Sequence, residues 1–257
     1  MKNYSPFQLL LVFLSGLTLL FIVAPLIIML FDTTLGQIVE SSQDEEVLNS
    51  IWLTLWTSML ATICFSLIAI PFSYIISKKE FPFKQLLLGI IDLPIVIPHS
   101  AAGIAILGFI SRDSAIGKFA SFFGINLVGH PFGIAMAMAF VSIPFVINAA
   151  RDGFSNVPDR LEKAALNLGA SPVQVFFTVS LPIAWRSILS GLVMMFARGM
   201  SEFGAVVIVA YHPMITPVLI FERFSSYGLD YARPVSIIFI AISLSVFILM
   251  RFLVRKK

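Results

Sequence analysis

Long apolar runs alternate with short polar segments along the chain. A helix needs about 20 mostly apolar residues to cross a bilayer, because each backbone polar group must be paired within the segment. Six runs reach this length. They predict an all-α polytopic membrane protein with six transmembrane helices, at approximately residues 7–31, 50–77, 86–110, 131–150, 188–211 and 234–254.

The composition indicates that lipid is the natural solvent of this chain. Of its 257 residues, 58% are apolar and 12% are charged, and the mean hydropathy is +0.97. An ordinary soluble domain is about 45–50% apolar and about 25% charged. The first run exceeds the apolar region of about 7–15 residues in a signal peptide, so we expect it to remain as a span. Residues 1–257 are expected to form a single transmembrane domain.

The distribution of basic residues predicts the orientation. Of the 17 Lys and Arg residues, 12 lie near the termini and in the connections 78–85 and 151–187, whereas four lie in the remaining connections. Cytoplasmic connections of membrane proteins carry the excess of positive charge. We therefore expect a multi-pass protein of the cell membrane with both termini in the cytoplasm. The net charge of +3 is too small and too scattered to indicate a nucleic-acid partner.

The connection 32–49 is predicted to lie outside the cytoplasm. It contains five acidic residues and no basic residue. It is interpreted either as a solvated acidic loop or as a docking face for a basic patch on an extracytoplasmic protein.

Residues 151–187, between the fourth and fifth spans, are too long for an ordinary structureless loop. Asn156 can cap a first helix with Pro158 just inside its start, and Gly169 can end that helix in the left-handed conformation. Ser171 and Pro172 form a second start signal.

The second helix of this segment is predicted to stop before Pro182, which lacks an amide hydrogen. The result is a helix-turn-helix that presents apolar residues to the cytoplasm. Such a surface fits a groove on another protein.

This segment resembles a known family motif. The run 161–172, followed by Phe176 and by Leu181 with Pro182, is similar to the EAA loop of binding-protein-dependent ABC transporter permeases. That loop has Glu-Ala-Ala, with Gly six positions after the Glu. Here the alanines and the glycine are present, but Lys163 stands at the Glu position and an acid appears one place earlier, as Glu162.

The resemblance implies that the loop docks on a separate ATPase subunit. The residues assigned to this coupling loop are Glu162, Lys163, Ala164, Ala165, Gly169, Ala170, Ser171, Pro172, Phe176, Leu181 and Pro182. The family further implies a two-permease pore, most simply a homodimer, with an ATPase dimer clamped against both loops. Closure of the ATPase would tilt the spans and open the path alternately to each side.

Two other segments resemble a narrower branch of the family. Residues 92–98 and 198–206 are similar to the corresponding stretches of sulfate, molybdate and tungstate permeases, most of all those for tungstate and molybdate. The family resemblance covers residues 50–254. It implies import of a tetrahedral oxyanion that an extracytoplasmic binding protein delivers, without distinguishing among the three anions.

Charged residues inside the predicted spans are candidates for the translocation path. Arg198 and Glu202 are four residues apart, so they share a helix face and can neutralise each other beside Ser201. They are interpreted either as lining or gating the path, or as a structural ion pair. Asp92 and His99 are seven residues apart and are expected roughly on one side of the third span. His99 is either a substrate contact or an interior histidine with a satisfied hydrogen bond.

The prolines of the third span predict a kink. Pro94 and Pro98 lie between Asp92 and His99, and each leaves a backbone carbonyl unpaired.

Motifs for catalysis on this chain are missing from the sequence. It has no Gly-x-x-x-x-Gly-Lys-Ser/Thr loop, so ATP and Mg²⁺ are expected only on the partner ATPase, and the chain is not expected to be an enzyme. Neither a cofactor nor a metal is expected, because the three His residues and the single Cys lack ligand spacing.

Two alternative classes of function stay open. In a secondary carrier driven by an ion gradient, Asp92 and Glu202 would be the coupling carboxylates. A non-transporting scaffold would leave the charges inside the spans unexplained.

Overall fold

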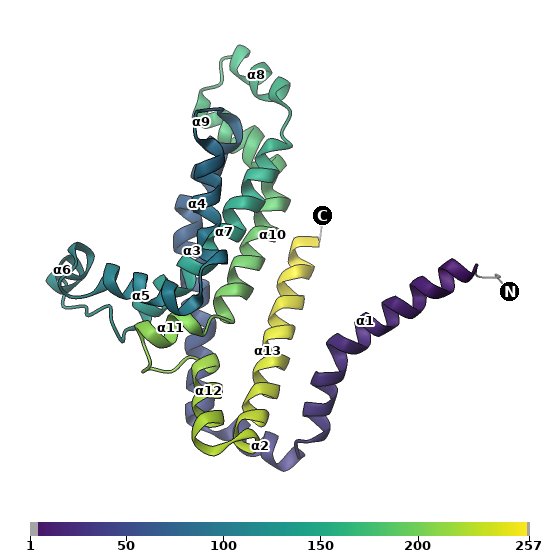
Figure 1. Ribbon diagram of the computed structural model, residues 1–257. Helices are drawn as coiled ribbons and strands as arrows, with labels where there is room; N and C mark the ends of the chain where they lie inside the picture. Colours follow the sequence, from purple (N-terminus) through teal and green to yellow (C-terminus); the bar gives the residue numbers. More distant parts are fainter. Residues whose placement is uncertain (1–4, 256–257) are drawn as a thin grey trace.

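The computed structural model describes residues 5–255, and every regular element within them is helical (Figure 1). The elements are α1 (Pro6–Phe31), α2 (Leu35–Gln43), α3 (Glu45–Lys78), α4 (Lys84–Val96), α5 (His99–Ile110), α6 (Ala115–Phe122), α7 (Pro131–Ser155), α8 (Asp159–Asn167), α9 (Pro172–Val175), the π-helical turn η1 (Phe176–Ser180), α10 (Leu181–Met200), α11 (Gly204–Val209), α12 (Thr216–Tyr227) and α13 (Leu229–Arg255). Lys2, Lys256 and Lys257, which enter the charge count, lie outside the described residues.

Five helices are long and apolar enough to cross a membrane. They are α1, α3, α7, the continuous helix Pro172–Met200 and the part of α13 from Leu229 to Phe252. The remaining predicted span corresponds to α4 and α5, which meet at an angle of 107°. The all-α class and the set of six apolar segments are confirmed, the third of them as a bent pair.

The central packing unit consists of α3, α7 and α10, which lie side by side (Figure 1). Small residues on α7 allow close approach of its neighbours. Hydroxyl groups buried on α3 are satisfied within that helix, since Thr57, Thr62 and Ser73 each donate to the carbonyl oxygen four residues earlier. Thr54 makes the same kind of bond to Ser50 and also connects two elements, because its hydroxyl oxygen accepts the Thr216 backbone N–H of α12 at 2.8 Å.

The first helix lies apart from this unit. Figure 1 shows α1 leading away from the other long helices, and none of its side chains is buried.

The prolines of the third predicted span break it more sharply than a kink. Because α4 ends at Val96 and α5 begins at His99, Asp92 and His99 lie on two differently directed helices. The expectation that they share one side of a single span is therefore wrong.

The fifth predicted span begins earlier and ends earlier than expected. Its helix is continuous from Pro172 to Met200, so the prediction of a stop before Pro182 is wrong. The widened π turn η1 directly precedes α10, and it accommodates the proline ring in the second position of α10. At its C-terminal end, residues 201–203 leave the helix before α11 begins, so the span does not continue to residue 211.

The start of α8 also differs from the prediction. Asn156 caps the end of α7, which extends to Ser155, and Pro158 takes the N-cap position of α8.

The crossing of α7 and α10 depends on Gly191. A Cβ atom at this position would lie 2.7 Å from Ala149 Cβ and 3.1 Å from Val146 Cα. We expect Gly191→Ala to destabilise the protein by about 1–3 kcal/mol, because overpacked helices must move apart. The measurement is the temperature at which detergent-solubilised protein loses its monodisperse elution peak. Gly89→Ala is the matched control, since a Cβ there meets nothing within 4 Å; equal temperatures for the two variants would contradict this prediction.

Candidate functional site

The predicted coupling loop consists of α8, a turn and α9. Gly169 has a φ of +91°, which ends α8 as its sequence position suggested. Ser171 and Gln174 form a reciprocal capping box at the start of α9. These local signals fix the turn.

The loop presents most of its apolar residues to the surroundings. Leu168 at the turn is 89% exposed, and Val173 and Phe177 are also largely exposed. Phe176 is half-buried instead, and its ring packs edge-on against Tyr74 with 5.0 Å between centroids. Of the other assigned residues, Lys163, Ala164, Gly169, Ser171, Pro172 and Pro182 are exposed, whereas Ala165, Ala170 and Leu181 are half-buried.

Glu162 differs from its exposed neighbours, since 12% of its side chain is exposed. Its carboxylate lies 3.0 Å from Lys78 Nζ and accepts hydrogen bonds from the hydroxyl groups of Ser180 and Tyr74. Lys78 Nζ also lies 3.0 Å from Asp159 Oδ1, and this hydrogen bond and charge lower the pKa of Asp159 below its usual range. The sequence did not identify Lys78, Tyr74 and Ser180 as partners of Glu162. The one signal for them was a lysine at the end of a predicted span.

A second cluster, made of Arg198, Glu202 and His99, joins the break between α4 and α5 to the break between α10 and α11. Arg198 Nη2 lies 2.9 Å from Glu202 Oε2, so the expected ion pair is confirmed. His99 Nδ1 lies 2.8 Å from the same oxygen, and Glu202 Oε1 accepts the backbone N–H of Ala205 at 2.8 Å. Because the Glu202 side chain is 1% exposed, water does not stabilise its charge, and these partners do so instead.

His99 lies between the guanidinium and the carboxylate. Arg198 Nη2 lies 3.0 Å from His99 Nε2 and 3.1 Å from His99 Nδ1. A carboxylate only accepts, so the hydrogen bond between His99 and Glu202 is donated by His99 Nδ1. Ser201 is exposed and lies 3.4 Å from Arg198 Nη1. The histidine thus bridges the arginine and the buried carboxylate.

This second cluster lies deep in the apolar part of the molecule. A Cβ on Gly199, next to Arg198, would lie 3.7 Å from Ser58 Cβ of α3. Ser58 is about 20 Å along α3 from the end at Glu45, which is predicted to be the outer one, and about 30 Å from the other end at Lys78. Asp92 lies outside the cluster, because it pairs with Asn148 of α7 at 2.6 Å.

The predicted outer face contains a cavity of about 960 Å³, lined by α2, α12 and the adjoining ends of α3 and α13. Arg223 forms ion pairs with Asp44 and Glu46, and Arg233 lies 3.5 Å from Asp32. Partial burial raises the pKa of Asp44, but the hydrogen bonds and charge of Arg223 and its own helix-capping bonds lower it overall. The acidic connection is therefore partly neutralised by two basic residues from later in the chain.

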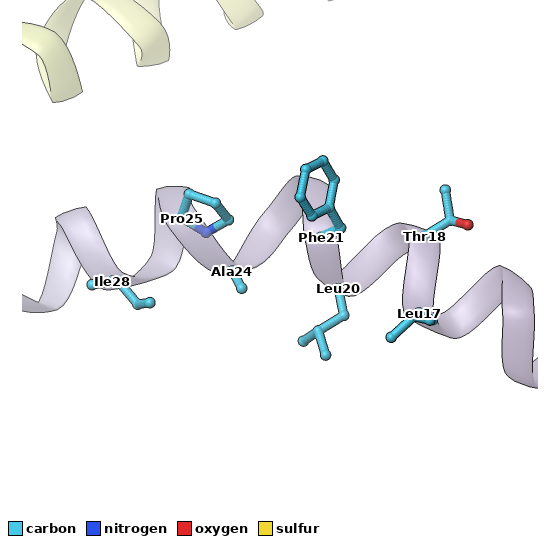
Figure 2. Close-up of a pocket in the computed structure, with 7 residues that line it drawn as sticks. All are labelled: Leu17, Thr18, Leu20, Phe21, Ala24, Pro25 and Ile28. Atoms are coloured by element: carbon cyan, nitrogen blue, oxygen red, sulfur yellow. The ribbon is translucent and has the colours of Figure 1, made fainter.

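A further hollow lies along α1, as Figure 2 shows. Its lining comes from α1 alone and is apolar except for Thr18. In Figure 2, Phe21 and Pro25 point to one side of the helix and Leu20 to the other, so these residues do not converge on a ligand. Within residues 5–255, no group of three His, Cys, Asp or Glu side chains could hold a metal ion.

Comparisons with known proteins agree with this architecture. A family model described as "Binding-protein-dependent transport system inner membrane component" matches residues 69–257. The chain is 40% identical to the molybdate/tungstate transport system permease protein WtpB of Pyrococcus abyssi, over 95% of this chain and 94% of that protein. It is 39% identical to WtpB of Methanocaldococcus jannaschii, over 93% of each chain. The crystal structure of a bacterial alginate ABC transporter in complex with a periplasmic protein has the same fold, with a TM-score of 0.75 at 16% identity over 97% of this chain and 94% of that one. The chain therefore belongs to the family of binding-protein-dependent transport system inner membrane components.

Proposed function

We propose that the chain is the permease subunit of an ATP-driven ABC importer for a tetrahedral oxyanion. The observation that carries this proposal is the 40% identity to a molybdate/tungstate permease along 95% of the chain. A probable sulfate permease of Marchantia polymorpha is 30% identical over 80% of the chain. Molybdate and tungstate are therefore proposed ahead of sulfate.

The partners follow from this role. A separate ATPase, which binds ATP and Mg²⁺, would dock on the exposed apolar residues of α8, the turn and α9. A binding protein would deliver the anion at the opposite face, where the acidic connection 32–49 and the 960 Å³ cavity lie. This arrangement requires the cytoplasmic orientation of both termini that the basic residues predict.

A second copy of the chain would complete the pore. None of the side chains of α1 is buried, and α1 leads away from the other long helices (Figure 1). An exposed apolar helix of this kind would pack against lipid and a neighbouring permease. We therefore propose that two copies of the chain form a homodimer.

The translocation path is proposed to pass Arg198, His99 and Ser201, with Glu202 behind them. The side chains of Arg198 and His99 are 25% and 39% exposed. A charged group facing lipid at this depth costs at least about 2.5–3.5 kcal/mol, so these exposed edges face water or protein instead. Guanidinium and hydroxyl donors match an anion that offers only acceptors. Asp92 is proposed to lie farther along the path, where its pairing with Asn148 limits repulsion of the anion.

Uptake by reconstituted vesicles tests the proposed function. We expect radiolabelled molybdate or tungstate to enter only when the chain is assembled with its ATPase, the binding protein and ATP. Uptake by the chain alone under a proton or sodium gradient would identify a secondary carrier and overturn the proposal. Absence of uptake under every condition would instead indicate a scaffold.

A further inference from the structure

The buried position of Glu162 suggests a role inside the permease. Its carboxylate belongs to the Glu162 cluster, which consists of Glu162, Lys78, Asp159, Ser180 and Tyr74. Lys163, the next residue on α8, is exposed to the surroundings. A partner that docks on the exposed surface of α8 therefore meets Lys163 and not the Glu162 carboxylate.

Lys78 is fully used within the cluster. An ammonium group has three N–H donors. The Nζ atom of Lys78 lies 3.0 Å from each of three acceptors: the Val157 carbonyl oxygen, Asp159 Oδ1 and Glu162 Oε2. The last residue of α3 is thereby attached both to the turn before α8 and to α8 itself.

Ser180 attaches the same carboxylate to the fifth span. It is completely buried and is the last residue of the π turn η1, which continues directly into α10. Single π-helical turns occur often at functional positions, because they alter the path of a helix locally. One carboxylate thus joins the cytoplasmic ends of α3 and α10 to α8.

Aromatic packing reinforces this junction. The Tyr74 ring packs edge-on against Phe154 of α7 and Phe176 of η1, with centroid distances of 5.2 and 5.0 Å. Such pairs contribute about 0.5–1.5 kcal/mol beyond the area that they bury. The ends of α3, α7 and α10 therefore meet α8 through both polar and apolar contacts.

We propose that Glu162 and Lys78 are positioning residues that lock α8 to α3 and α10, so that the ATPase moves the three helices as one body. Glu162 acts through Lys78 and Ser180 and does not contact the ATPase. This inference rests on the proposed function, because it concerns how movement of a docked ATPase reaches the spans.

Glu162→Gln in the assembled transporter tests this proposal. The variant keeps the size and the acceptor for Ser180 but removes the charge that pairs with Lys78. We expect wild-type retention of the ATPase on purification, and about a ten-fold fall in anion transported per ATP hydrolysed. Glu80→Gln is the matched control, because it makes the same change at a glutamate that is 88% exposed, lies outside the coupling loop and pairs with Lys84; it is expected to leave transport per ATP unchanged. Lower ATPase retention in Glu162→Gln, with unchanged transport per ATP, would overturn the proposal by making Glu162 an ATPase contact.

Cross-linking provides a second test. If Glu162 and Lys78 only stabilised the fold, a cross-link between their positions would not restore transport per ATP. Lys78→Cys and Glu162→Cys are combined with Cys64→Ser, since Cys64 is exposed on α3. We expect this variant to transport little anion per ATP hydrolysed. A short thiol cross-linker is expected to restore transport per ATP, because the covalent link replaces the ion pair between positions 78 and 162. Further inhibition by the cross-linker would overturn the proposal, since it would mean that α8 must move relative to α3. A wild-type complex that neither retains an ATPase nor transports an oxyanion would instead refute the proposed function.

Discussion

Replacement of Glu202 with alanine is expected to remove most of the folded protein from the membrane. The Glu202 side chain is 1% exposed, and its loss leaves Arg198 and His99 without their common acceptor. Removing one partner of a buried ion pair costs about 3–5 kcal/mol. That cost is a large share of the total stability of about 5–15 kcal/mol that is usual for a protein. The measurement is the fraction of extracted protein that elutes as a monodisperse species.

A paired replacement separates folding from transport. Changing Arg198 to methionine and Glu202 to glutamine removes both charges, which is often neutral or stabilising for a buried pair, and keeps an amide oxygen as acceptor for His99 and the Ala205 N–H. We therefore expect folded protein to return while uptake of molybdate per folded molecule stays at background. Uptake that recovers together with folding would make the pair purely structural and would contradict the proposed path.

Asp92→Asn is the matched control for the loss of a single acid. Asp92 is half-buried, and its partner Asn148 is a neutral amide, so no cation loses its partner. We expect a smaller loss of folded protein than for Glu202→Ala. A loss of equal size would indicate that any acid removed from this depth unfolds the chain.

Local sequence signals predicted much of the fold. Apolar runs of sufficient length gave the six candidate spans, because the bilayer imposes a length on each helix. Gly169 and Ser171 marked the turn after α8, since both act through backbone geometry within a few residues. The Arg198–Glu202 pair was predictable from its short separation in the chain, although the expected shared helix face is wrong, since Glu202 lies just beyond the end of α10.

Contacts between distant segments were not predictable in this way. His99 and Glu202 are 103 residues apart in the chain, and Tyr74 and Glu162 are 88 apart. No helical period relates such positions, so their pairing depends on how whole helices pack. The 107° bend between α4 and α5 belongs to the same class. Prolines predicted a weak point there, but the angle follows from close packing of α5 on α11, where a Cβ on Gly204 would lie 2.6 Å from His99 Cβ.

Replacement of Leu168 with aspartate is expected to abolish docking of the ATPase while the permease still folds. Leu168 is 89% exposed at the turn after α8, so a charge there costs little within the chain itself. Central residues of an interface contribute about 2 kcal/mol or more, which corresponds to at least about a 30-fold loss of affinity. The measurement is the amount of ATPase retained on the purified permease.

Leu35→Asp is the matched control, because Leu35 is 81% exposed at the start of α2, on the opposite predicted face. An exposed leucine outside the interface can be replaced without loss of the ATPase. Equal retention of the ATPase by both variants would therefore show that the turn after α8 is not the docking surface.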